Sequence, residues 1–313
     1  MTMTQPCIFL MGPTASGKTD LAIALVKHLP CDIISVDSAM VYQGMDIGTA
    51  KPNADILAQA PHHLINIRDP AEIYSVGQFC TDAITEIEKI QATGRIPLLV
   101  GGTMLYFHSL QQGLSKLPPA NHQIRQHLNN EAEQVGWAAM HQRLTQIDPQ
   151  TAQRIHPNDA QRIQRALEVY EVSGETMTAW YAKSPTQPWS FPTIKLVIAP
   201  AERSVLHVKI AQRFHVMLEQ GLIEEVRGLF ERGDLNSDLP SMRCVGYRQV
   251  WSYLAGELDN ASLSEKAIIA TRQLAKRQMT WLRTQMDAHW FDSLKPNMTQ
   301  SVLKFLAKIH KLF

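Results

Sequence analysis

Short apolar runs alternate with helical patterns along the chain, first in residues 7–100 and again near residue 194. The runs have the length of buried strands, and the segments between them repeat apolar residues at helical spacing. The strand candidates are Cys7–Met11, Asp32–Val36, 63–67, Ile96–Val100 and Ile194–Ile198. The clearest helix candidates among them are Thr19–Leu29 and Val76–Gln91. Because strands that alternate with helices are typical of a parallel sheet covered on both faces, the pattern predicts an α/β fold.

The pattern changes between Leu117 and about Pro192. A Leu117-Pro118-Pro119 break is followed by helical segments with no strand between them, including Trp137–Ile147 and a helix that we expect Asn158 to cap. We therefore predict an all-helical insertion at residues 118–190. Residues 1–117 and 191–313 are then expected to form the catalytic core, which ends in C-terminal helices.

Composition limits the class of protein more than its function. The chain has 313 residues, of which 45% are hydrophobic and 19% charged, as in ordinary globular proteins of about two domains. A net charge of +1 does not indicate a nucleic-acid partner, so the placement of the charges has to decide that. The four cysteines form no CxxC pair, and the first residues lack the pattern of a signal peptide. We expect a cytoplasmic protein with reduced thiols and no membrane span.

A glycine-rich segment follows the first predicted strand and opens the first predicted helix. It fits the phosphate-binding pattern GxxxxGK[ST] at every position and consists of Gly12, Pro13, Thr14, Ala15, Ser16, Gly17, Lys18 and Thr19. Its backbone N–H groups and the lysine suit a polyphosphate, and the Thr19 hydroxyl suits Mg²⁺. ATP and a prenyl pyrophosphate fit such a P-loop equally well. The loop alone therefore indicates a small-molecule kinase as the default function.

Further motifs change that interpretation. They are DSAMVYQ at 37–43, DIGTAKP at 46–52, GGT at 101–103, RCVGYR at 243–248 and KRQMTWLR at 276–283. Together with the P-loop NTPase-like pattern, these motifs occur in an order that is typical of one family. Over the range from Ile8 to Trp290 the chain resembles the tRNA dimethylallyltransferase (tRNA isopentenyltransferase) family. The chain lacks the C-terminal zinc finger frequent in eukaryotic members, so it resembles the bacterial form.

The resemblance implies a reaction and its participants. Members transfer a dimethylallyl group from dimethylallyl pyrophosphate to N6 of the adenosine immediately 3′ of the anticodon in tRNA, with Mg²⁺ and without consuming ATP. It implies catalytic roles for Lys18, Asp37, Thr103 and Arg213, with Asp37 as the base. Asp37 also follows a predicted strand at the edge where ligands bind in open α/β sheets. Helix capping by Asp37 and loop capping by Thr103 are the structural alternatives.

An adenine in a stacked anticodon loop must be flipped out to react, which requires cations for the phosphates. Arg272, Lys276 and Arg283 fall on one helical face, with Met279 between them, whereas Leu274 and Trp281 lie roughly opposite and are expected to pack inward. A solvated surface is the alternative interpretation of this stripe. The resemblance predicts tRNA contacts at Asp37, Ser38, Ala39, Met40, Thr103, Arg125, Gln161, Arg162, Ile163, Gln164, Arg165, Arg243, Cys244, Val245, Gly246, Tyr247, Arg248, Lys276, Arg277, Gln278, Met279, Thr280, Trp281, Leu282 and Arg283.

Three other functions stay open at this point. A small-molecule kinase explains the P-loop but not the basic helix or the insertion. An isopentenyltransferase of free adenine nucleotides shares the donor but needs no surface for a large acceptor. A non-enzymatic RNA-binding protein has no use for Lys18 or Asp37. Nothing in the sequence requires an oligomer, so we expect a monomer.

Overall fold

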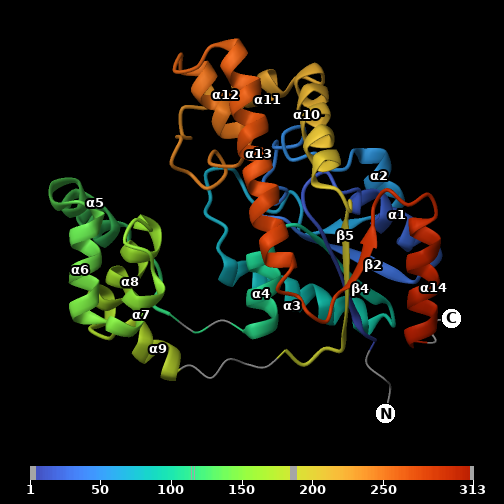
Figure 1. The fold of residues 1–313 in the computed structure, drawn as a ribbon, viewed down its shortest axis with the longest axis horizontal. Coiled ribbons are helices and arrows are strands. Elements are labelled where there is room, and N and C mark those ends of the chain that lie inside the picture. The colour runs from blue at the N-terminus through green and yellow to red at the C-terminus, as the bar shows by residue number, and fades with distance from the viewer. Residues whose placement is uncertain (1–4, 114, 116, 184–188, 311–313) are drawn as a thin grey trace. The chain divides into compact units, whose positions relative to one another are not determined.

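A single parallel sheet forms the centre of the fold (Figure 1). A computed structural model describes residues 5–113, 115, 117–183 and 189–310. Within them the six strands are ordered β3-β2-β4-β1-β5-β6, and every neighbouring pair is parallel. The strands are β1 (Cys7–Met11), β2 (Cys31–Val36), β3 (His62–His63), β4 (Ile96–Gly101), β5 (Thr193–Ala199) and β6 (His289–Asp292). The predicted parallel α/β fold is confirmed.

Helices cover both faces of the sheet. Alternate residues of β1 point to opposite faces, so Ile8 and Leu10 pack in the cluster that includes α1 and α14. Phe9 faces the other way and contacts Phe107 of α4, with ring centroids 5.0 Å apart. The helices of this part of the chain are α1 (Lys18–His28), α2 (Ala54–Gln59), α3 (Val76–Ala92), α4 (Met104–Gln112), α10 (Arg203–Glu219), α11 (Leu222–Phe230), α12 (Tyr247–Leu254), α13 (Asn260–Leu282) and α14 (Met298–His310). None of the helices in the described ranges is both long and apolar enough to cross a membrane.

The structure corrects two local predictions and adds a strand that was not predicted. The strand expected at 63–67 is wrong beyond His63, because Leu64 and Asn66 have φ angles of 63° and 54° and leave the extended conformation. The strand β6 was not predicted, because its four residues are too few for a periodic pattern. The helix expected to start after Asn158 is capped instead by Asp159, whose side chain accepts the N–H of Arg162.

Residues Leu110–Trp189 form a compact unit separate from the unit of Met1–Ser109 and Ser190–Phe313. Its described residues contain no strand, and Leu128, Leu144, Ile163 and Leu167 are among the side chains of its own core. The helices are α5 (His122–Val135), α6 (Trp137–Ile147), α7 (Pro149–Arg154), α8 (Ala160–Ser173) and α9 (Met177–Lys183). A role for this unit in binding tRNA stays a prediction.

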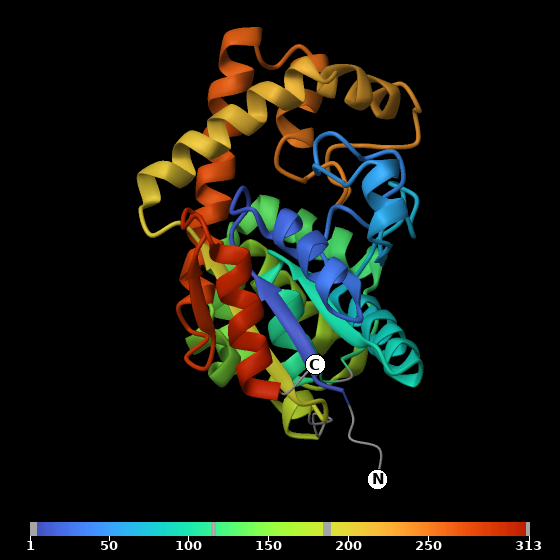
Figure 2. The same ribbon diagram turned by 90° about the vertical axis from the view of Figure 1, so that its right-hand side faces the viewer.

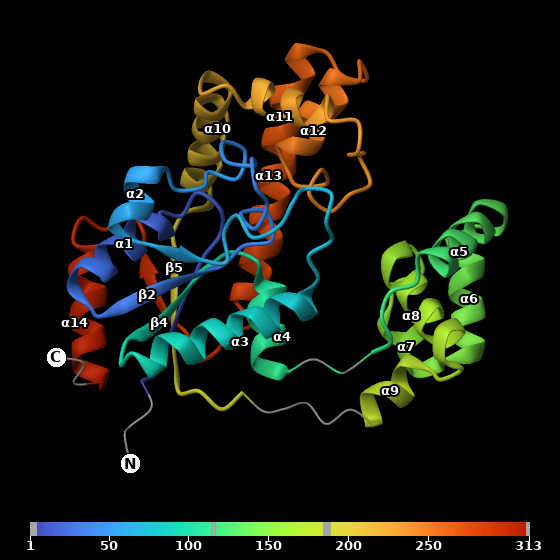
Figure 3. The ribbon, with the colours of Figure 1, turned by 180° about the vertical axis from the view of Figure 1, so that it is seen from behind.

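The strand order brings three sequence motifs to one edge of the sheet. β4 lies between β2 and β1, and Gly101 is in register with both Val36 and Met11. The residues after these strands, at 12, 37 and 102, therefore meet at the carboxyl edge, where ligands bind in such sheets. The helices α10 (yellow) and α13 (orange) lie beside this edge both in the view from the side (Figure 2) and in the view from behind (Figure 3).

Candidate active site

The phosphate loop connects β1 to α1, as its motif predicts. The loop turns through the left-handed region at Ala15 and Gly17, where φ is 61° and 85°. A β-carbon on Gly12 would overlap the carbonyl oxygen of Ile198 on β5, so only glycine fits there. α1 begins at Lys18 without a side-chain cap. Its first N–H groups can therefore donate to an anion.

Two cations, Lys18 and Arg213, lie at the loop. The Lys18 ammonium donates to the carbonyl oxygen of Pro13 at 2.7 Å. Burial, and to a smaller extent the Arg213 charge, lower the pKa of Lys18 to about 7 against the opposing effect of Asp37. Burial also lowers the pKa of Arg213, again against the effect of Asp37. Arg213, on α10, donates to the carbonyl oxygen of Thr49 at 3.4 Å. The negative charge near these two cations does not offset the effect of burial on their pKa values. A bound pyrophosphate would supply the missing negative charge.

The phosphate loop and the strand ends line one cavity of about 560 Å³. Apolar side chains contributed by α10 and α13, Ile210, Phe214 and Leu274 among them, line it as well. A second hollow, of about 1010 Å³, borders the same loop on the side of α2 and shares Lys18, Thr19 and Arg213. All four catalytic candidates, Lys18, Asp37, Thr103 and Arg213, line the first cavity.

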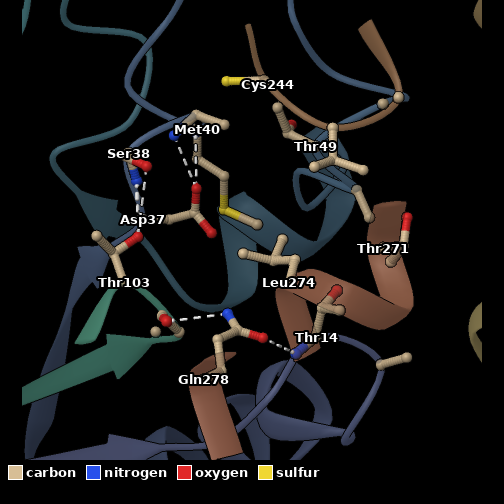
Figure 4. A pocket seen from close by; sticks show the side chains of 18 of the residues that line it. Thr14, Asp37, Ser38, Met40, Thr49, Thr103, Cys244, Thr271, Leu274 and Gln278 are labelled. Carbon is tan, nitrogen blue, oxygen red and sulfur yellow. Dashed lines mark hydrogen bonds between the residues drawn. The ribbon is translucent and has the colours of Figure 1, made fainter. Parts of the chain in front are cut away.

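Asp37 follows β2, and its carboxylate has one oxygen engaged. Oδ1 accepts the N–H of Ala39 at 2.8 Å and that of Met40 at 3.3 Å (Figure 4). No helix starts at this position, so the helix cap expected as the alternative role is wrong, and the two bonds hold a turn instead. They leave Oδ2 to accept a proton from a molecule bound in the cavity that Asp37 lines. Holding this turn and accepting a proton are therefore compatible at this position.

Thr103 joins the ends of two strands. Its hydroxyl oxygen accepts the backbone N–H of Ser38 at 3.1 Å and donates to the Ser38 hydroxyl at 3.5 Å (Figure 4). The Thr103 side chain therefore holds the turn after β4 against the segment that begins with Asp37. This contact orients the candidate base, whatever Thr103 does with a substrate.

One face of α13 lines the cavity. Leu274, Arg277, Gln278 and Trp281 belong to it, so the inward side that we expected for Leu274 and Trp281 is the wall of a cavity. Lys276, Thr280 and Arg283 are exposed, Arg272 and Met279 are partly buried, and Leu282 is buried. The predicted basic stripe thus keeps two exposed cations, Lys276 and Arg283.

The segment 243–248 contributes to the cavity wall from Arg243 to Tyr247. Arg243 and Arg248 are exposed, Cys244 and Val245 are partly buried, and Tyr247 is fully buried. Burial raises the pKa of the Tyr247 hydroxyl, which donates to Glu225 at 2.5 Å. The side chains of Tyr247, Leu282 and Ile163 are all inaccessible. RNA contacts predicted at these three positions would have to come from the backbone or from neighbours.

Glu225, in the first turn of α11, is a structural centre that sequence reasoning missed. Its carboxylate accepts the N–H groups of Asp46, Ile47 and Gly48 at 2.9, 2.7 and 3.2 Å, in addition to the Tyr247 hydroxyl. It thereby holds the DIGTAKP segment, whose Thr49 carbonyl accepts from Arg213. The DIGTAKP motif was the only sign of this contact in the sequence, because no local pattern links the motif to Glu225, about 180 residues later.

The unit Leu110–Trp189 holds the remaining predicted tRNA contacts. The buried Glu168 on α8 accepts from Arg125 at 2.9 and 3.1 Å and from Arg165 at 2.7 Å. These hydrogen bonds and charges lower the pKa of Glu168 against the opposing effect of burial. Gln161 and Arg162 are exposed and Gln164 is partly buried. Glu168 thus holds two of the predicted contact arginines side by side.

Comparisons with known proteins agree on one family. The family model described as IPP transferase matches residues 40–285. A tRNA dimethylallyltransferase of Coxiella burnetii (strain Dugway 5J108-111) is 56% identical over 96% of this chain and 97% of the relative. The solved tRNA isopentenylpyrophosphate transferase of Bacillus halodurans is 35% identical, with a TM-score of 0.71 over 98% of this chain and 97% of that one. A eukaryotic dimethylallyltransferase solved acting on tRNA is 26% identical, with a TM-score of 0.81 over 97% of this chain and 80% of that one. The chain therefore belongs to the IPP transferase family.

Proposed function

We propose that the protein transfers a dimethylallyl group from dimethylallyl pyrophosphate to N6 of the adenosine immediately 3′ of the anticodon in tRNA. The observation that carries the proposal is that the phosphate loop and Asp37 face one cavity. The names of the relatives support tRNA as the acceptor and disfavour the kinase and free-nucleotide alternatives.

The phosphate loop holds the leaving group. As N6 attacks, the new C–N bond forms and the allylic C–O bond breaks, so charge develops on the pyrophosphate oxygens. Lys18, Arg213 and the N–H groups at the start of α1 stabilise that charge. Leu274 lies between Thr14 and Asp37 in Figure 4, where it offers an apolar surface to the prenyl group.

Asp37 takes the proton that N6 loses. An exocyclic amine is a weak nucleophile until its proton is removed, and a carboxylate with one unengaged oxygen is a suitable acceptor. Thr103 holds the adjoining Ser38 and lines the same wall. The adenine must enter the cavity out of its stack, and Trp281 at the cavity offers a ring for stacking.

The site suits Mg²⁺ bound together with the donor. No group of three or more His, Cys, Asp or Glu side chains in the described part of the chain forms a metal cage. Mg²⁺ favours few protein ligands combined with substrate phosphates, and Thr19 lines both hollows beside the loop. Thr19 would hold the ion there, and the bound ion would supply positive charge beside the pyrophosphate leaving group.

A transfer assay tests the function. Radiolabelled dimethylallyl pyrophosphate with Mg²⁺ is offered to an unmodified anticodon stem-loop, to the same stem-loop with the target adenosine replaced, and to AMP. We expect label only in the first. Labelled ATP with small-molecule acceptors runs in parallel. Phosphoryl transfer without prenyl transfer would contradict the proposal, and preferential labelling of AMP would support the free-nucleotide alternative.

A monomer and a cytoplasmic location remain part of the proposal, and sedimentation of the purified protein tests whether it is a monomer.

The exposed Lys276 provides a test of the tRNA surface. Replacing it by alanine should weaken binding of the stem-loop and reduce the slope of log K against log salt by about 1, because each neutralised phosphate releases counterions. The measurement is stem-loop affinity at several salt concentrations. Lys308→Ala, which removes an exposed lysine from α14, is the matched control and should leave the slope unchanged. Equal slopes in wild type and Lys276→Ala would exclude the phosphate contact.

A further inference from the structure

The amide of Gln278 bonds to two separate loops of the active site. Its Oε1 accepts the backbone N–H of Thr14 at 2.9 Å, and its Nε2 donates to the carbonyl oxygen of Gly102 at 2.9 Å (Figure 4). Thr14 belongs to the phosphate loop after β1, and Gly102 to the turn after β4. A single side chain from α13 thus ties the two loops together.

The chemistry of the two partners requires an amide. A backbone N–H can only donate and a carbonyl oxygen can only accept, so the side chain between them must offer one acceptor and one donor at the same reach. Glutamate has no donor for Gly102, and methionine has neither function. The contact is also close, because a β-carbon on residue 102 would overlap Nε2. Glycine at 102 and glutamine at 278 are therefore matched to each other.

The proposed pyrophosphate site and the candidate base Asp37 both depend on the loops that this amide joins. The Thr14 N–H is already bonded to Gln278, which leaves the cradling of pyrophosphate to the later N–H groups of the loop. On the other side, Gly102 precedes Thr103, which bonds to Ser38 next to Asp37. The Gln278 side chain thus fixes the position of the phosphate loop directly and that of the candidate base through Gly102, Thr103 and Ser38.

We propose that Gln278 is a positioning residue, which sets the distance between the pyrophosphate loop and the Asp37 end of the cavity. This inference deepens the proposed function and rests on it. It replaces the direct tRNA contact that the sequence motif predicts for this residue. Its neighbours Lys276 and Arg277 are exposed on the same helix, so α13 joins the predicted tRNA surface to both loops.

The expected effect is on turnover and not on tRNA affinity. Reacting groups must meet at close range, and a displacement of about 1 Å can cost about 100-fold in rate. We expect Gln278→Met, which has similar length but neither hydrogen bond, to lower kcat by about 10-fold to 100-fold. Gln278→Glu keeps the acceptor for Thr14 and places an oxygen against the Gly102 carbonyl, so its kcat should fall as well. The dissociation constant of the stem-loop for Gln278→Met, and its salt slope, should match those of wild type.

The matched control is Gln273→Met, the same change at an exposed glutamine of α13. Single-turnover transfer at saturating substrates gives the rate, and amide hydrogen exchange at Thr14 reports the link without relying on activity. Faster exchange at Thr14 in Gln278→Met, with normal exchange in Gln273→Met, supports the proposal. Unchanged exchange overturns it, as does a weaker stem-loop affinity with an unchanged rate. Thermal unfolding establishes that the variants are folded, and a wild type that transfers no label contradicts the proposed function alone.

Discussion

Replacing Asp37 by asparagine is expected to lower the rate of prenyl transfer by about 100-fold to 10,000-fold, the range that a positioned general base contributes. Asparagine retains an oxygen for the N–H groups of Ala39 and Met40 but cannot take a proton from N6. The measurement is single-turnover transfer to an anticodon stem-loop at saturating donor. Binding of the stem-loop should survive, because the turn after β2 is preserved.

Asp37→Ala separates the two roles of this residue. Alanine removes both the base and the acceptor of the turn, so it should abolish transfer. If asparagine supports near-normal turnover and only alanine is inactive, Asp37 acts by holding the turn. A large loss of rate in both variants, with the stem-loop still bound, leaves proton acceptance as its function.

Replacing Lys18 by methionine is expected to lower the rate by about 100-fold to 1,000-fold, as for removal of one preorganised group from a developing charge. The ammonium lies at the phosphate loop with its pKa lowered to about 7 by burial. A bound pyrophosphate favours the charged form and must raise that pKa. The measurements are single-turnover rate and pyrophosphate affinity.

The same pKa gives the affinity a definite pH dependence. Above about pH 7 the lysine of the free enzyme is neutral, so binding takes up a proton, and pyrophosphate affinity should fall by up to about tenfold per pH unit until the pKa of the complex is reached. Below about pH 7 the lysine is already charged, so its contribution is constant. Lys18→Arg stays charged throughout and is the control, because its affinity should lack this decline. A decline of the same size in Lys18→Arg would assign it to another group.

The local patterns allowed much of the fold and many site residues to be predicted. Buried strands and the P-loop motif are short-range features, because strand length, apolar runs and a turn of fixed spacing depend on neighbouring residues. The failures were also local in origin. Left-handed residues at Leu64 and Asn66 end a strand that apolar content favours, and the four-residue β6 forms because β5 offers it an edge.

The P-loop NTPase-like fold and the phosphate loop with Lys18 were determined by the sequence itself, because each follows from residue types at fixed spacing along the chain. The catalytic roles of Asp37 and Thr103 came from the family resemblance and stay predictions. The tertiary structure alone decided which side chains support them. Glu225 holds the DIGTAKP segment and Gln278 joins Thr14 to Gly102 across large separations in sequence. It also turned Leu274 and Trp281 toward a cavity. Periodicity shows which residues share a helix face but not what that face meets, since the neighbour is set by the packing of the whole chain.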